Sequence, residues 1–335
     1  MSKTHDSAID FLRVISILAV VLIHTTTRHL EIVHYDLINN SFALLLNQVS
    51  RFAVPLFFLV SGFVLELNYK KMNYLVYLKK RTSRILIPYL IWSIIYYYFI
   101  YTNHTTNFLK AILTGSASYQ LYFVPSLFIF YLIFPLIHRI YFLISNKLVL
   151  IILAIIELFL LHTDYQTHTS ILPYPVAVFL FNYFVFVLGM IFSRNRESFV
   201  KIINRFKLIL FPLTLWAGFY VFNEGKTNYL KTYNFEAFYS QWRPSVLIYT
   251  ILISSVLYLF ATKVNLKFLK KISDLSFSVF FIHVIILEFI WKYFVTNDVL
   301  FFAVTAIFSF LAAYLISIIP ITLKSILKKI NHSSV

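Results

Sequence analysis

Long apolar segments separated by short polar connections run through the whole chain. Segments of about 20 apolar residues are typical of membrane-spanning helices, and the period-2 alternation of membrane strands is absent. The pattern predicts an all-α, polytopic transmembrane helical bundle of about ten spans. Nine or eleven spans also fit, because the fifth is short and the last two almost touch. The predicted spans are residues 8–27, 43–67, 84–102, 119–141, 147–162, 171–193, 207–223, 244–262, 275–296 and 298–320.

Composition agrees with this pattern and excludes several classes of protein. Of the 335 residues, 60% are hydrophobic and 13% are charged, and a soluble protein carries about twice that charged share. The chain has no cysteine, which excludes disulfides, thiolate metal sites and cysteine thioester intermediates. Its five glycines are scattered, which excludes a glycine-rich phosphate loop and hence ATP-driven transport by this chain alone. We expect a single integral membrane domain over residues 1–335.

The distribution of positive charge predicts the orientation in the bilayer. With the N-terminus placed in the cytoplasm, 22 of the 29 Lys and Arg residues fall on the cytoplasmic side and seven on the other. Lys and Arg hold loops in the cytoplasm, so the net charge of +16 is explained by the lipid bilayer and requires no nucleic acid. Both termini are therefore predicted to be cytoplasmic, which requires an even number of spans.

The first apolar segment carries three titratable residues, Asp10, Arg13 and His24. Ionisable groups inside a span are costly and indicate a functional site. Arg13 and His24 are eleven residues apart, which places both on one helix face about 16 Å apart along the axis, and Asp10 is expected to pair with Arg13. Considered alone, Arg13 is more simply an anchor at the cytoplasmic edge of the span, and His24 an interhelical hydrogen-bonding residue. Together they favour function, with His24 as a general base.

The second and third spans carry further candidates. Ser61 and Gly62 form a small-residue step that lets helices approach closely, and we favour this packing role over a nucleophilic Ser61. Arg51 lies too deep in the span to lack a partner. Arg81 and Arg84 share a helix face, and two guanidinium groups there suit a phosphate or pyrophosphate. By position alone, however, an anchor role for this pair is favoured.

Three more features have open interpretations. Glu157 lies in an apolar run and needs a partner such as Arg51 or His24, so function and structure are equally favoured. His283 lies about 12 Å from the predicted cytoplasmic face and, taken alone, is more simply a structural hydrogen bonder. The aromatic segment 119–125 fits either an interfacial belt or a substrate mouth. No recognised metal-ligand spacing is present, so no metal is expected.

Five motifs, in this order, resemble those of the membrane-bound acyltransferase 3 family, and they cover almost the whole chain. They are Asp10-x-x-Arg13 with His24 eleven residues later, Phe57-Phe58-x-x-Ser61-Gly62-Phe63, Arg81-x-x-Arg84 before Pro88-Tyr89, the aromatic segment 119–125, and Ser276-x-x-x-Phe280-x-Ile282-His283. The chain is similar to the short members that lack an extracytoplasmic esterase domain, among them polysaccharide O-acetyl- and O-succinyltransferases. It departs from them at 120–124, which reads Gln-Leu-Tyr-Phe-Val where relatives often have His-Leu-Trp-Phe-Leu.

The resemblance implies transfer of an acyl group from acyl-CoA, with acetyl-CoA as the first choice, to a hydroxyl of a cell-surface glycan or lipid-linked sugar. It implies a location in the bacterial cytoplasmic membrane. It also implies that Arg13 and His24 are essential and that Arg81 and Arg84 hold the CoA end or the active conformation.

We therefore expect an O-acyltransferase in which His24 is the base, Glu157 orients it if their helices meet, and His283 or Ser61 assists. A covalent acyl-His intermediate is an alternative. The rival function is export of a glycan or lipid-linked sugar, with the intramembrane polar groups lining a path. A third is a structural partner of a polysaccharide synthase.

Overall fold

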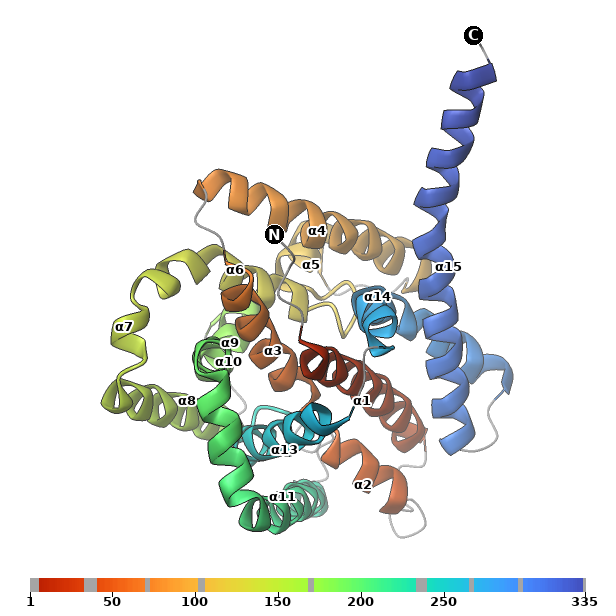
Figure 1. The fold of residues 1–335 in the computed structure, drawn as a ribbon. Helices are drawn as coiled ribbons and strands as arrows, with labels where there is room; N and C mark the ends of the chain where they lie inside the picture. The colour runs from red at the N-terminus through yellow and green to blue at the C-terminus, as the bar shows by residue number, and fades with distance from the viewer. Residues whose placement is uncertain are drawn as a thin grey trace.

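The computed structural model describes residues 6–32, 41–69, 73–101, 106–167, 172–232, 240–264, 268–294 and 298–333, and this part of the chain is helical without strands. Figure 1 shows the helices gathered into one bundle. The elements are α1 (Ser7–Ile32), α2 (Ser41–Val49), α3 (Ala53–Leu67), α4 (Tyr74–Ile95), the π-helix η1 (Tyr96–Ile100), α5 (Phe108–Thr114), α6 (Phe123–Arg139), α7 (Tyr141–Ile144), α8 (Lys147–Thr167), α9 (Tyr174–Leu180), α10 (Tyr183–Arg194), α11 (Arg196–Thr232), α13 (Pro244–Lys263), α14 (Leu269–Phe294) and α15 (Asp298–Ser333).

The predicted all-α membrane bundle is confirmed, and the number of full-length spans is slightly lower than predicted. Among the described residues, eight helical stretches are long and apolar enough to cross a membrane. The pair α9 and α10, bent by 47° at its break, makes a ninth. The predicted span 119–141 corresponds to α6, an apolar helix of 17 residues, which is at the lower limit for a transmembrane helix.

Helices α4 and α11 extend well beyond the apolar segments that predicted them. The predicted third span begins at residue 84, but α4 begins ten residues earlier, where the Asn73 side chain caps it by accepting the Leu75 N–H at 2.9 Å. Likewise α11 has 37 residues where 17 were predicted. Lys, Arg and Glu are good helix formers, so a helix continues through charged turns where hydropathy has already fallen. As a result, Arg81 and Arg84 lie in the middle of α4 and not at the start of a helix.

Helix α1 lies at the centre of the bundle, with α2, α3, α13, α14 and α15 packed around it (Figure 1). Within its most apolar window 67% of residues are buried, compared with 17% for α8 and 22% for α4 and α11. The helices with low burial expose long apolar side chains, as helices that face lipid do. Groups on α1 are therefore enclosed by protein.

Helices α1 and α14 run side by side in the same direction. Three cross-contacts follow one another along the pair: Asp10 with Ser273, His24 with His283, and Arg28 with Glu288. Each contact joins polar groups, so the predicted functional face of α1 is the face that meets α14.

Helices α3 and α10 cross closely at two glycines. A Cβ atom added to Gly62 would lie 2.1 Å from the carbonyl oxygen of Phe186, and one added to Gly189 would lie 2.0 Å from that of Leu59. No side chain fits at such distances, so the crossing requires glycine on both helices. The predicted close approach at Ser61-Gly62 is thus confirmed.

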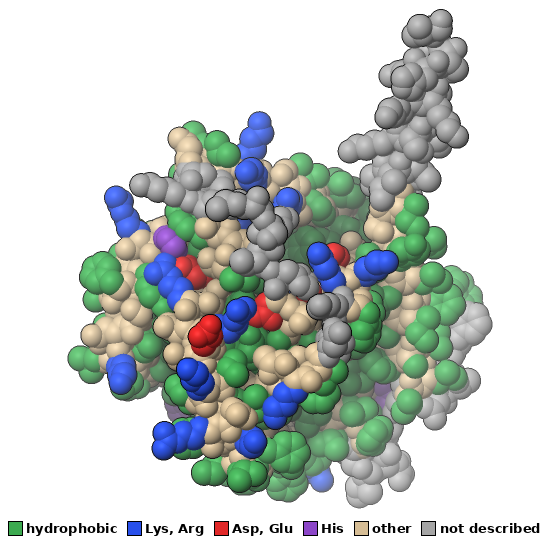
Figure 2. Space-filling view, viewed as in Figure 1, with side chains coloured by type: hydrophobic (Ala, Val, Ile, Leu, Met, Phe, Trp, Pro, Cys, Tyr) green, Lys and Arg blue, Asp and Glu red, His purple; other side chains and the backbone are tan. Residues whose placement is uncertain are grey.

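Figure 2 shows the face on which α1 begins, with Lys and Arg side chains spread among hydrophobic ones. Exposed basic residues of the predicted cytoplasmic side include Lys79, Lys80, Arg139, Lys147, Arg196 and Lys201. Lys70 and Lys71, which belong to the same predicted side, lie outside the described residues. The assignment of this side to the cytoplasm stays a prediction.

Candidate active site

Two cavities adjoin α1, one near each end of its polar face. We call them the arginine cavity, of about 450 Å³, which contains Arg13, Arg81 and Arg84, and the histidine cavity, of about 470 Å³, which contains His24 and Arg51. Helices α1, α3, α4, α6 and α14 contribute to the arginine cavity. The structure therefore brings the predicted site residues together as two groups and not as one.

The arginine cavity joins the cations of α1 and α4. The Arg13 guanidinium lies 3.9 Å from an Asp10 oxygen, as the spacing predicted, and the Ser273 hydroxyl donates to that same oxygen at 2.9 Å. The Asp10 carboxylate is therefore shared between α1 and α14. Ser61 also lines this cavity.

The two arginines of α4 face the cavity in different ways. The Arg81 guanidinium lies over the rings of Tyr77 and Tyr131, 5.5 Å from each centroid, an arrangement in which a planar cation is held by two aromatic faces. Arg84 is exposed at the cavity edge. The structure thus brings the three guanidinium groups to one cavity, and planar guanidinium groups are the side chains that suit phosphate oxygens.

The histidine cavity is more varied in chemistry. Besides His24 and Arg51 it is lined by acidic, tyrosine and amide side chains, including Glu31, Tyr101, Tyr119, Tyr122, Tyr174, Gln241 and Glu288. The imidazole of His24 is half-buried and lies 4.8 Å from the Tyr119 ring and 5.3 Å from the His283 ring, measured between centroids. An imidazole at a polar cavity wall is placed to exchange a proton with a bound hydroxyl.

Three phenylalanine rings lie between the two cavities. Phe123 has its ring centroid 5.8 Å from that of Phe57 and 5.5 Å from that of Phe280, and all three line the arginine cavity. We call them the aromatic layer. Consecutive residues Tyr122 and Phe123 line different cavities, so the layer is thin.

The aromatic segment 119–125 contributes side chains to both cavities. Tyr122, at the position where relatives often have Trp, lines the histidine cavity and accepts a hydrogen bond from the Gln241 amide at 2.7 Å. Gln120, at the position of the relatives' His, is buried and accepts from the Ser118 hydroxyl at 2.6 Å. The departure at 120 thus falls on a group that does not line the cavity.

A buried amide, Asn47, connects Arg51 to α1 and was missed by the sequence analysis. Its side-chain nitrogen lies 2.9–3.2 Å from the Ile23 carbonyl and the hydroxyls of Thr26 and Thr27, while its oxygen accepts from Arg51. Two adjacent amides in an apolar run were a visible signal, because buried polar groups in a span need partners. Asn47 supplies the partner that Arg51 was predicted to require.

The second amide, Gln48, extends this network to α11 and the start of α13. It donates to Asn47 at 3.1 Å and accepts from Arg243 at 2.6 Å, and Arg243 in turn lies 3.4 Å from Glu224. Arg243 is fully buried. Burial lowers the pKa of its guanidinium, and the Glu224 carboxylate offsets part of this effect.

The structure places Glu157 away from His24, which corrects the expected orienting role. Glu157 is fully buried on α8 and accepts the backbone N–H of Phe184 at 2.6 Å, in the first turn of α10. A carboxylate at a helix N-terminus satisfies an amide that has no partner within the helix. Its hydrogen-bond partner is therefore the backbone that follows the break between α9 and α10. Glu157 lines neither cavity.

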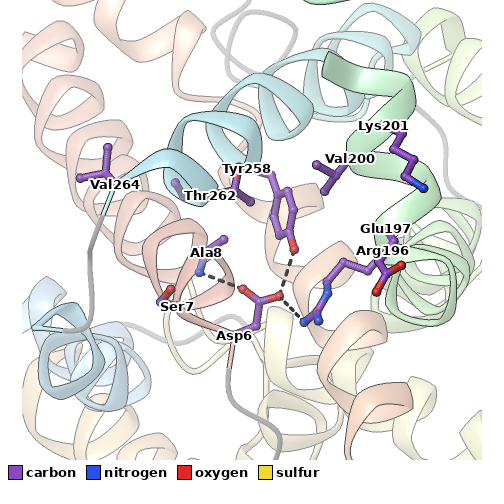
Figure 3. Close-up of a pocket in the computed structure, with 11 residues that line it drawn as sticks. Asp6, Ser7, Ala8, Arg196, Glu197, Val200, Lys201, Tyr258, Thr262 and Val264 are labelled. Carbon is purple, nitrogen blue, oxygen red and sulfur yellow. Dashed lines mark hydrogen bonds and ion pairs between the residues drawn. The ribbon is translucent and has the colours of Figure 1, made fainter. Parts of the chain in front are cut away.

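A third pocket, of about 550 Å³, lies where α1 begins. Asp6 accepts the Ala8 N–H at 2.9 Å, the Tyr258 hydroxyl at 2.9 Å and the Arg196 guanidinium at 3.1 Å (Figure 3). Asp6 is thus an N-cap that also fastens α1 to α11 and α13. These contacts fix the start of the helix that carries Arg13 and His24.

Fold and site together define a multi-pass helical membrane protein in which three arginines line one cavity along α1 and a histidine lines the other. The acyltransferase domain profile of the acyltransferase 3 family matches residues 6–318. The chain belongs to this family.

Curated relatives are similar over most of their length. The chain is 26% identical to a probable poly-beta-1,6-N-acetyl-D-glucosamine export protein of Staphylococcus aureus (strain N315) over 315 residues, 89% of this chain and 88% of the relative. It is 25% identical to a protein of the same name from Staphylococcus epidermidis over 275 residues, 76% and 74% of the two chains. No solved structure matches significantly. The chain is thus related to membrane proteins that handle polysaccharide.

Proposed function

We propose that this protein is a membrane O-acyltransferase that moves an acyl group from acyl-CoA to a hydroxyl of a cell-surface glycan or lipid-linked sugar. The observation that supports it best is the pair of cavities along α1, with three arginines in one and His24 in the other. A CoA thioester has a highly charged end, which suits the three arginines, and a reactive end about one pantetheine arm away, where His24 lines the second cavity with Arg28, Arg51, Glu31 and Glu288.

The donor binds with its phosphates among Arg13, Arg81 and Arg84. With the predicted orientation, this end faces the cytoplasm, where acyl-CoA is made. Arg13 and His24 are separated by about 16 Å along α1, a span comparable to an extended pantetheine arm. The arm reaches His24 by displacing the rings of the aromatic layer, which close the path when no donor is bound.

His24 acts as the general base in the transfer. It takes the proton of the acceptor hydroxyl while the oxygen attacks the thioester carbonyl, so that a C–O bond forms. The tetrahedral intermediate collapses by breaking the C–S bond, and the imidazolium returns its proton to the departing thiolate. The products are an ester and free CoA, and His24 ends neutral.

The acceptor occupies the histidine cavity. Tyr119, Tyr122 and Tyr174 offer ring faces and hydroxyl groups, and Gln241 adds an amide. This combination suits a sugar, which needs both apolar contact and hydrogen bonds. The named relatives concern poly-N-acetylglucosamine, so a related glycan is the first acceptor to test. In this proposal the protein resides in the bacterial cytoplasmic membrane, beside the synthase that makes the glycan.

Export of a glycan is the second candidate function, because the relatives from Staphylococcus are named as probable export proteins. Two cavities separated by a thin layer also resemble the halves of a closed path. An exporter does not need an arginine site for pyrophosphate or a base at residue 24. Its activity would therefore survive His24→Gln in part and would not depend on CoA.

The test is turnover of acyl-CoA by the purified protein in nanodiscs. Labelled acetyl-CoA and succinyl-CoA are offered with a β-1,6-linked N-acetylglucosamine oligosaccharide, for the wild type, H24A and R13A. Exposed residues of α8 and α11 supply the controls H162A and R205A. We expect turnover that is lost in H24A and R13A and kept in both controls. A folded wild type that does not bind CoA refutes the proposal and favours the exporter.

A further inference from the structure

His283 has one ring nitrogen whose protonation is fixed by the backbone of its own helix. Nδ1 lies 3.1 Å from the carbonyl oxygen of Val279 and 2.8 Å from that of Phe280. Carbonyl oxygens only accept hydrogen bonds, so Nδ1 must carry the hydrogen. In the neutral ring, Nε2 is then the nitrogen with the free lone pair.

That second nitrogen is buried without a hydrogen-bond partner among the described residues. The whole side chain is fully buried, and an acceptor withdrawn from water without a donor is unfavourable. A purely structural histidine would leave this acceptor unsatisfied for no gain. The arrangement therefore indicates a donor that approaches Nε2.

The neighbouring ring is that of His24, with centroids 5.3 Å apart and planes tilted by 31°. Each ring nitrogen lies about 1.1 Å from its ring centre, so at this separation two ring nitrogens come within about 3 Å when they point at each other. Nε2 of His283 has no such partner in the part of the chain that the structure describes, so a rotation of the His24 ring is required to point an N–H at it. His24 lines the histidine cavity whereas His283 does not. His283 is thus placed behind His24 as seen from the cavity.

The backbone around His283 is also held in place. The Tyr96 hydroxyl donates to the Phe281 carbonyl at 2.6 Å, and the Trp92 ring is stacked on that of Phe281 with planes 3° apart. These contacts fix α14 against α4 and η1 at the turn that presents His283. A rigidly held acceptor constrains the group that donates to it.

We propose that His283 is a positioning residue that selects the reactive tautomer of His24. Nε2 of His283 accepts the N–H of one His24 nitrogen, which leaves the other His24 nitrogen unprotonated and facing the cavity. This inference rests on the proposed O-acyl transfer. It assigns to a second, neutral histidine the orienting task that sequence reasoning gave to Glu157.

The hydrogen bond persists through the proton transfer. When the free nitrogen of His24 takes the acceptor's proton, both His24 nitrogens carry hydrogen, and the inner N–H still donates to His283. No proton passes to His283. When the thiolate leaves, the cavity-facing nitrogen gives its proton away and the original tautomer returns.

Two variants test the proposal by turnover of whichever of acetyl-CoA or succinyl-CoA the wild type uses. His283→Gln keeps an acceptor oxygen, while His283→Met has similar volume and no comparable acceptor. We expect H283M to lower kcat by about 10- to 100-fold, less than loss of the base itself, with KM for acyl-CoA within about twofold. H283Q should stay within about fivefold of wild-type kcat. Equal losses in both variants, or a fully active H283M, overturn the proposal.

A second measurement does not depend on activity. Nitrogen-15 NMR of histidine-labelled protein in nanodiscs reports the protonation of each ring nitrogen, and the His283 signals are those lost in H283Q. We expect a protonated Nδ1 and a bare Nε2 whose signal moves in H24L and stays in the control H162L. A protonated Nε2, or one insensitive to H24L, overturns the proposal. The NMR result can be as expected while neither the wild type nor any variant turns over acyl-CoA. In that case the proposed acyl transfer is wrong and the hydrogen bond between the two histidines is supported.

Discussion

Replacing Gly62 by alanine tests the close crossing of α3 and α10. The new Cβ would lie 2.1 Å from the Phe186 carbonyl oxygen, so the helices must part by about 1.4 Å to restore ordinary van der Waals contact at about 3.5 Å. A gap of that size removes roughly half of the attraction of each atom pair, and some fifty pairs across the crossing then lose about 4 kcal/mol. Alanine returns up to about 1 kcal/mol of helix propensity, which leaves a net loss of about 3 kcal/mol.

The assay is thermal unfolding of the protein in nanodiscs, together with acyl-CoA turnover. We expect G62A to lower Tm by about 4 °C and to reduce turnover, because Ser61 beside it lines the arginine cavity. Gly218→Ala is the matched control, since its Cβ meets only the flexible end of Tyr249 at 3.2 Å. Gly189→Ala should match G62A, and the double variant should lose less than their sum because the helices have already parted. A G62A protein as stable as G218A would refute the reasoning.

Three further predictions follow from buried polar groups. Glu157→Gln keeps an acceptor for the amide at the start of α10, so it should leave Tm unchanged and turnover within about twofold of wild type. E157L should lose about 1–3 kcal/mol of stability in the same unfolding assay, and an E157L protein as stable as wild type would contradict the capping role. Arg243→Leu removes the guanidinium that contacts both Glu224 and Gln48 and should lower the free energy of unfolding by about 3 kcal/mol. An unchanged Tm would show that the fold does not depend on this network. Asn47→Leu removes the hydrogen bonds that join Arg51 to α1 and should lower kcat about tenfold. CoA binding, measured by titration, should stay intact. Weaker CoA binding would count against a role confined to the histidine cavity.

Hydrophobic patterning predicted where the helices lie because membrane spans are set by apolar length. It could not predict that α4 starts at Tyr74 or that α11 has 37 residues, because charged turns continue a helix without adding hydropathy. The bend between α9 and α10 was also invisible. Glu157, on another helix, accepts a backbone N–H at the start of α10 beside this bend.

The candidate site was predictable where it depends on one helix. The eleven-residue spacing placed Arg13 and His24 on one face, and that face meets α14 at both ends. Their separation into two cavities was not predictable, since the aromatic layer comes from α3, α6 and α14. Contacts between remote helices decide which neighbours a side chain has, and periodicity along one helix carries no such information. The catalytic roles assigned to these residues stay predictions.

The pairing of α1 with α14 has a consequence for biosynthesis. Asp10 and Ser273 are 263 positions apart, and Arg28 and Glu288 are 260 apart. A ribosome adds about 5–20 residues per second, so the first helix waits on the order of 10–50 s for α14. During that interval Asp10, Arg13 and His24 sit in a nascent chain without the helix that completes their surroundings. Assembly of the candidate site is therefore among the late events of translation, and an incomplete chain released from the ribosome before α14 lacks the helix that completes it.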